Sequence, residues 1–172
     1  MPHDIAPIAV RPSTLSGLSE QMVVSHYENN YGNAVQSLNA VRRDLATLDP
    51  ATPPYRLGAL KQEELGLMGS VELHELYFSN LGGFTPAGAG AGLGSPDWHE
   101  LPDAFVAAVA ADFGSGSAWR REFTGLAQSL ARGSGWVLLT YSHPDKRLWN
   151  QIAIDHTQAV VDAAPVLVLD MY

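Results

Sequence analysis

The first half of the chain carries its hydrophobic and small residues at helical spacing. Residues 1–16 contain three prolines and are predicted to be extended, and Ser19 then stands as the N-cap of a long helix. Positions three and four residues apart form one face of this helix. They are Met22, His26, Asn30, Ala34, Leu38, Val41 and Leu45. Asp49-Pro50 ends the pattern, and a second helix is predicted over residues 60–81 after a turn at Pro53-Pro54.

The second half of the chain changes from helical to strand-like patterns. Residues 82–97 are rich in Gly, Ala and Pro and are predicted to be a linker. Two helices are predicted over residues 101–113 and 118–131, with Ser117 as the N-cap of the second. Three apolar runs then predict strands, joined in part by a hairpin connection over residues 142–146. The strands span residues 136–141, 148–154 and 165–169.

This order of elements places the chain in the α+β class. The predicted N-terminal domain, residues 1–90, is an antiparallel helical hairpin. The predicted C-terminal domain, residues 91–172, is a mixed layer of helices with a small three-stranded antiparallel sheet.

Composition and charge narrow the classes of protein. With 46% hydrophobic and 16% charged residues, the composition is that of a globular protein. A net charge of -8 argues against nucleic acid and against an anionic membrane as partners. The absence of cysteine from the sequence excludes disulfides, thiolate catalysis and cysteine-ligated metal sites. With neither a signal-peptide pattern nor an apolar run of about 20 residues, we expect a cytoplasmic protein.

Two of the six histidines are candidates for chemistry. His26 and His74 lie on the apolar faces of two separate predicted helices, whereas the histidines at 3, 99 and 143 are expected on the surface. Asp170 ends an apolar strand, where a carboxylate is costly unless it is paired or binds an ion. Two histidines and an aspartate match a mononuclear non-haem metal site in ligand type. Core histidines bonded to backbone carbonyls are the alternative, because the chain has no local H-x-x-x-H motif.

Five segments, in order along the chain, resemble the iron/manganese superoxide dismutases. The first runs from Ser19 to Asn39 and contains His26, and the second is His-Glu-Leu-Tyr-Phe at 74–78. The other three are Asp-Phe-Gly-Ser at 112–115, Gly-Ser-Gly-Trp at 133–136 and Pro-Val-Leu-Val-Leu-Asp at 165–170. The resemblance implies a two-layer fold, one iron or manganese ion per subunit, a homodimer, and an antioxidant oxidoreductase acting on superoxide.

The resemblance also implies roles for individual residues. His26, His74 and Asp170 correspond to metal ligands, and His156, after the second strand, corresponds to the group that bonds the metal-bound solvent. Aromatic residues correspond to the wall of the metal pocket. They are Tyr77, Phe78 and Trp136.

The chain departs from the family pattern in the pocket wall. Asn30 and Ala34 stand where the family usually has histidine and tyrosine, and both positions share a helical face with His26. Tyr27 and Tyr31 would point about 100° and about 140° away from His26 around an α-helix, so we expect neither to replace the missing tyrosine.

The resemblance places a fourth ligand, a histidine, four residues after Asp170, and a glutamate that bridges subunits just before that histidine. The sequence ends at Tyr172, and we expect it to be a truncated form of a longer protein. Our expectation for function is superoxide disproportionation, with iron and manganese equally compatible with these ligands. The alternative is a superoxide-dismutase-like binding or structural module without catalysis. A two-histidine-one-carboxylate oxygenase is a weaker third hypothesis.

Overall fold

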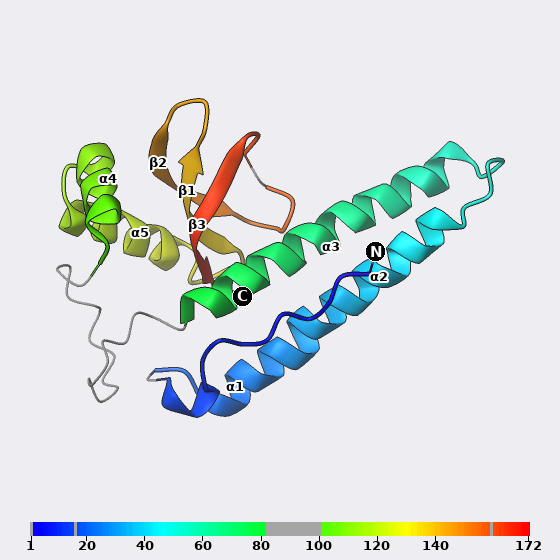
Figure 1. Ribbon diagram of the computed structural model, residues 1–172, viewed down its shortest axis with the longest axis horizontal. Coiled ribbons are helices and arrows are strands. Elements are labelled where there is room, and N and C mark those ends of the chain that lie inside the picture. Colours follow the sequence, from blue (N-terminus) through cyan, green and yellow to red (C-terminus); the bar gives the residue numbers. More distant parts are fainter. Residues whose placement is uncertain (1, 16, 82–100, 159) are drawn as a thin grey trace.

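Two long helices form one layer of the molecule, and a small sheet with two further helices forms the other (Figure 1). The computed structural model describes residues 2–15, 17–81, 101–158 and 160–172. The α-helices are α1 (Glu20–Ser25), α2 (Gly32–Ala46), α3 (Pro54–Leu81), α4 (Asp103–Phe113) and α5 (Gly116–Ser129). The strands are β1 (Trp136–Ser142), β2 (Arg147–Ala153) and β3 (Ala163–Asp170). A 3₁₀ turn, η1 (Pro12–Thr14), and a π-helical segment, η2 (His26–Tyr31), complete the described elements. The α+β prediction is confirmed.

The first predicted helix contains a π-helical interruption. Ser19 caps it as expected, because its side chain accepts a hydrogen bond from the N–H of Met22. Between α1 and α2, however, η2 widens the turn, and the N–H of Gly32 donates to the carbonyl of Tyr27, five residues earlier. The prediction of a single regular α-helix was therefore wrong at this point. The difference matters because η2 begins at His26.

Helix α3 runs antiparallel to α2 and is longer than predicted. It begins at Pro54, six residues before the predicted start. The two prolines at 53–54 indicated a turn, but proline is favourable in the first turn of a helix, where its missing N–H has no partner to lose. Helix α3 contacts α2 along the hairpin, and the C-terminal half of α3 contacts the sheet (Figure 1).

The N-terminal segment lies along the hairpin and is held by paired hydrogen bonds. The backbone N–H of His3 donates to Asn39 Oδ1 at 2.7 Å, and Asn39 Nδ2 donates back to the His3 carbonyl at 2.8 Å. His3 Nε2 also lies 2.7 Å from Glu75 Oε1 on α3. His3 is partly exposed, in line with a surface position, but its ring also has a partner. A side chain far away in sequence provides its partner, and no local pattern shows that.

Strand β1 is the centre of the sheet, whose order is β2-β1-β3 with both pairs antiparallel. The predicted hairpin connection joins β1 to β2, which agrees with residues 142–146. A register shift between Leu139 and Thr140 lies opposite Pro165 in β3. Proline cannot donate to the ladder, so a bulge accommodates it. The three-stranded antiparallel prediction is confirmed.

The sheet separates two hydrophobic clusters. Trp136 and Leu138 of β1 pack with the hairpin, and the alternate residues Val137 and Leu139 pack with α4 and α5. Helix α5 begins two residues earlier than predicted, because Ser115 and not Ser117 is its N-cap, accepting from the N–H of Ala118.

Some sequence predictions fall outside the described residues. They are the linker at 82–97, the domain boundary at 90/91 and the surface position of the histidine at 99. Within the described part of the chain, the helices are too short or too polar to cross a membrane.

Candidate metal centre

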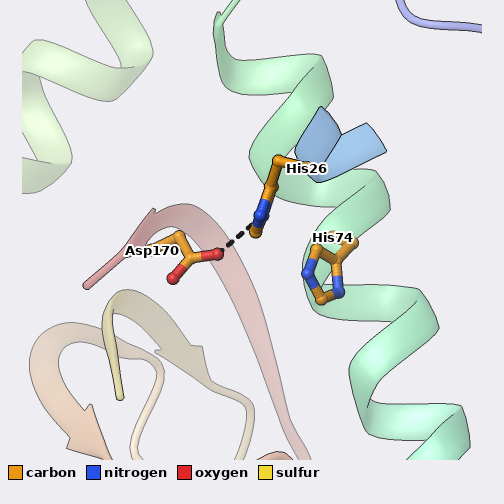
Figure 2. A group of neighbouring side chains, drawn as sticks. All are labelled: His26, His74 and Asp170. Carbon is orange, nitrogen blue, oxygen red and sulfur yellow. Dashed lines mark ion pairs between the residues drawn. The ribbon is translucent and has the colours of Figure 1, made fainter. Parts of the chain in front are cut away.

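His26, His74 and Asp170 meet where the helical hairpin touches the sheet (Figure 2). His26 begins η2, His74 lies on α3, and Asp170 is the last residue of β3. One possible ligand atom from each residue lies within 4.8 Å of the others. The structure thus brings together three side chains that are 48 and 96 residues apart in the sequence.

Burial keeps His74 neutral and a hydrogen bond fixes its tautomer. The residue is only 4% exposed, and this burial lowers the pKa of His74 to about 4. Its Nδ1 lies 2.7 Å from the backbone carbonyl of Ser70, one helical turn earlier. Since a carbonyl only accepts, the single proton of the neutral ring sits on Nδ1. The other ring nitrogen, Nε2, therefore has its lone pair available for a metal ion.

His26 and Asp170 form a close pair that no hydrogen bond explains. His26 Nε2 lies 2.8 Å from Asp170 Oδ2, drawn as a dashed line in Figure 2. Both atoms are nevertheless among the buried polar atoms of the described residues that lack a hydrogen-bond partner, because the two groups are not aligned for one. The Asp170 side chain is 5% exposed. Buried polar atoms without partners are costly, and an ion between them would satisfy both.

The donor set fits a transition-metal ion. Two imidazoles and a carboxylate are ligands that iron and manganese accept. Metal bonds to such nitrogen and oxygen atoms are about 2.0–2.2 Å long, so two ligand atoms of one ion would lie at most about 4.4 Å apart. The observed spread of 4.8 Å therefore needs only a small contraction. The arrangement can hold one ion in an enclosed, largely apolar setting.

Aromatic side chains surround the three residues, as the sequence led us to expect. The Tyr77 and Phe78 rings lie 5.7 and 5.6 Å from the His26 ring between centroids. The Trp136 ring meets the His74 ring edge-on at 5.1 Å. Burial, and then the charge of Asp170, raise the pKa of Tyr77, so its hydroxyl stays protonated at neutral pH.

His156 lies beside this group, on the loop after β2. Its ring centroid is 6.1 Å from that of His74 and 5.6 Å from that of Trp136. The Tyr172 ring stacks on it at 5.5 Å, with 8° between the planes. Burial lowers the pKa of His156, so its ring is neutral at neutral pH. A neutral ring offers both a donor and an acceptor nitrogen next to the candidate ligands.

The π-helical segment changes the environment of the two residues that depart from the family pattern. Asn30 Nδ2 lies 3.0 Å from His26 Nδ1, and Ala34 is buried within the hairpin core. In a regular α-helix, Tyr31 would point away from the site. In the structure, Tyr31 is 1% exposed, and its ring centroid is 6.3 Å from that of His74. Tyr31 reaches the edge of the site because η2 brings residues five apart toward the same face. A π-helix leaves no clear signal in a sequence of helical spacing.

Tyr31 is fixed by partners that sequence reasoning missed. Its hydroxyl donates to Glu75 Oε1 at 2.8 Å and accepts from the N–H of Ala6 at 2.7 Å. Burial, together with Glu75, raises the pKa of Tyr31 to about 12. Tyr31 therefore closes the side of the site that faces the N-terminal segment and is not an open gateway residue. Glu75 follows His74 directly, and this adjacency is the one signal that the sequence offered.

The fold and these side chains define a two-layer α+β protein with a candidate mononuclear metal centre. Residues 102–172 match the family model of the C-terminal domain of iron/manganese superoxide dismutases. An iron superoxide dismutase of Cupriavidus metallidurans is 46% identical over 173 residues, covering 100% of this chain and 81% of that protein. A manganese superoxide dismutase of Halobacterium salinarum is 31% identical over 160 residues, covering 90% of this chain and 70% of its own length. The chain belongs to the iron/manganese superoxide dismutase family.

Proposed function

We propose that this chain disproportionates superoxide at one iron or manganese ion held by His26, His74 and Asp170. The single observation that carries the proposal is the convergence of three ligand-type side chains, one buried and two partly buried, in a chain 46% identical to an iron superoxide dismutase. Two superoxide ions and two protons give one dioxygen and one hydrogen peroxide. The ion, when bound, supplies the redox step by taking up and releasing one electron in turn. The same identity disfavours a non-catalytic binding module.

Each ligand residue is suited to its proposed role by its surroundings. His74 is held neutral with Nε2 free, and Asp170 offers a buried negative charge that an ion would balance. His26 would bind through Nε2 and donate its Nδ1 proton to the amide of Asn30, which requires the amide oxygen to face the ring. Asn30 would then orient His26, the first residue of η2.

The pocket wall and His156 control water and protons around the three ligands. Tyr77, Phe78 and Trp136 cover the ligand rings with apolar surface and limit the entry of water. Ala34 packs with these three residues in one core cluster. We propose that the His156 ring, which is neutral at neutral pH, carries a proton for the reaction on one of its nitrogens. This N–H would donate a hydrogen bond beside the three ligands.

We also propose, from the family resemblance, that the chain acts as a homodimer in the cytoplasm and removes superoxide as an antioxidant enzyme. The residues 1–90 and 91–172 would then be the helical and mixed domains of each subunit. Sedimentation equilibrium tests the dimer, and cell fractionation tests the location. A monomer at working concentrations, or a protein recovered outside the cytoplasm, would overturn the respective part of this proposal.

The test of the proposed activity is the direct decay of superoxide. The metal-free chain is loaded separately with iron and with manganese, and superoxide decay is followed by stopped-flow absorbance. We expect at least one metal to give turnover that Asp170→Asn abolishes. Asp103→Asn is the matched control, because Asp103 is exposed in the first turn of α4, a helix that packs on the other face of the sheet. A chain that binds either metal in the site without any turnover would contradict the proposal.

A further inference from the structure

Helix α3 comes very close to the loop after β2 at a glycine that the site does not otherwise use. Gly69 lies five residues before His74, on the same helix. A Cβ at Gly69 would overlap the backbone carbonyl oxygen of His156, and it would lie 2.9 Å from the carbonyl carbon and 3.4 Å from the His156 Cβ. Backbone atoms cannot rotate away as a flexible side chain can. The loop carrying His156 can therefore reach its position only because residue 69 has no side chain.

The rest of the loop is braced so that this contact fixes His156. The Asp155 carboxylate accepts two hydrogen bonds from Thr157, both at 2.7 Å, which closes a tight turn around His156. The Gln158 side chain accepts from the N–H of Ile154 at 2.9 Å. A loop that is internally bonded in this way moves as a unit, so its distance from α3 sets the distance of the His156 ring from His74.

Two aromatic side chains also contact the His156 ring. The Tyr172 ring stacks on it, and the Tyr172 hydroxyl donates to the Ile154 carbonyl at 3.1 Å. Trp136 meets the ring edge-on. Displacement of the loop would break these contacts together. The neighbouring glycine, Gly66, differs sharply, because a Cβ there would meet only Thr157 Cγ2 at 4.0 Å.

We infer that Gly69 is a positioning residue for His156: the missing side chain admits the His156 backbone against α3 and so holds the imidazole beside the candidate ligands. This inference rests on the proposed function only for its catalytic consequence. The geometric part concerns the metal-free chain and stands apart from activity. A substitution at 69 should act through His156, and one at 66 should not.

The first test reads the His156 ring in the metal-free protein. Diethyl pyrocarbonate modification, mapped by mass spectrometry, measures how accessible the ring is. We expect the rate at His156 to rise several-fold in Gly69→Ala and to stay at the wild-type value in Gly66→Ala. An unchanged rate at His156 in a folded Gly69→Ala protein would overturn the inference, whether or not the chain is an enzyme.

If the Gly69→Ala protein does not fold, the contact between Gly69 and His156 is tested in the wild-type protein. Nuclear Overhauser contacts between the Gly69 α-protons and the His156 Cα and Cβ protons are expected in the metal-free chain. Their absence would show that the loop does not rest on α3 at this point, which would overturn the inference.

The second test asks whether Gly69 acts through His156 in the metal-loaded protein. The reduction potential of the bound ion should shift in Gly69→Ala in the direction seen in His156→Ala, and Gly66→Ala should leave it unchanged. Adding Gly69→Ala to His156→Ala should have no further effect on the potential. Additive shifts would overturn the inference, because they would show a route that bypasses His156. A loaded protein without superoxide turnover would refute the proposed function, yet the modification rates would still decide the role of Gly69.

Discussion

At His74, burial makes the stability of the metal-free protein depend on pH. The ordinary pKa of 6.5 applies in the unfolded chain, and the pKa is about 4 in the folded chain. The unfolded state therefore binds more protons between these values, so stability is present above pH 6.5 and is lost as pH falls toward 4. The loss is about 3 kcal/mol, because each tenfold difference in proton affinity between the two states corresponds to about 1.4 kcal/mol.

Chemical denaturation of the metal-free chain at several pH values between neutral and pH 4 measures this loss. His74→Gln is the matched variant, because glutamine keeps an amide donor near the Ser70 carbonyl but does not titrate. The difference between wild type and variant should shrink as pH falls through this window. Parallel stability curves for the two proteins would mean that His74 is not held neutral by burial.

At the scale of elements, the N-terminal segment is attached to the hairpin through Tyr31. Tyr31→Phe removes a buried hydroxyl that accepts a hydrogen bond from the Ala6 N–H and donates one to Glu75. We expect a loss of about 1–2 kcal/mol in the free energy of unfolding, because a donor at Ala6 is left without its partner. Faster amide hydrogen exchange over residues 3–6 should accompany the loss.

Tyr27→Phe is the control for this prediction. The Tyr27 hydroxyl donates to the carbonyl of the same residue, Ala6, at 2.8 Å, but this bond is exposed to water. Water can replace it, so the loss should be smaller than in Tyr31→Phe. Equal losses in the two variants would show that burial of the Tyr31 hydroxyl has no energetic consequence.

Within α3, the two glycines near the site should respond to alanine with opposite signs. Glycine inside a helix costs about 0.5–1 kcal/mol relative to alanine. Gly66→Ala should raise the stability by about that amount, because the new methyl group meets only ordinary contacts. Gly69→Ala should lower it, because the His156 carbonyl blocks the methyl group. Thermal denaturation of both variants checks the signs, and stabilisation by Gly69→Ala would contradict the packing described here.

For the molecule as a whole, the candidate ligands come from both layers, so a bound ion would join them. An ion that binds only the folded state at 100 times its Kd stabilises it by about 2.7 kcal/mol. We expect iron or manganese to raise the melting temperature of the wild-type chain and of Asp103→Asn, but not of Asp170→Asn. Calorimetry with and without metal measures this. A metal-dependent rise of equal size in Asp170→Asn would exclude Asp170 as a ligand.

The architecture and the meeting of the three candidate ligands could be predicted from the sequence, but the fine geometry around them could not. Apolar periodicity and turn residues fix the elements to within a few residues, and the start of α3 was missed because Pro54 fits a turn as well as a first helical turn. The family resemblance singled out His26, His74 and Asp170. The π-helical turn and the close approach at Gly69 depend on contacts between distant segments, which no local pattern encodes.

The most direct test of the central claim is an anomalous difference map from crystals of the metal-loaded protein, recorded at the absorption edge of the bound iron or manganese. The account predicts one dominant peak in each subunit, at bonding distance from His26 Nε2, a His74 ring nitrogen and an Asp170 carboxylate oxygen. A dominant peak elsewhere in the molecule, with these three side chains unliganded, would contradict it.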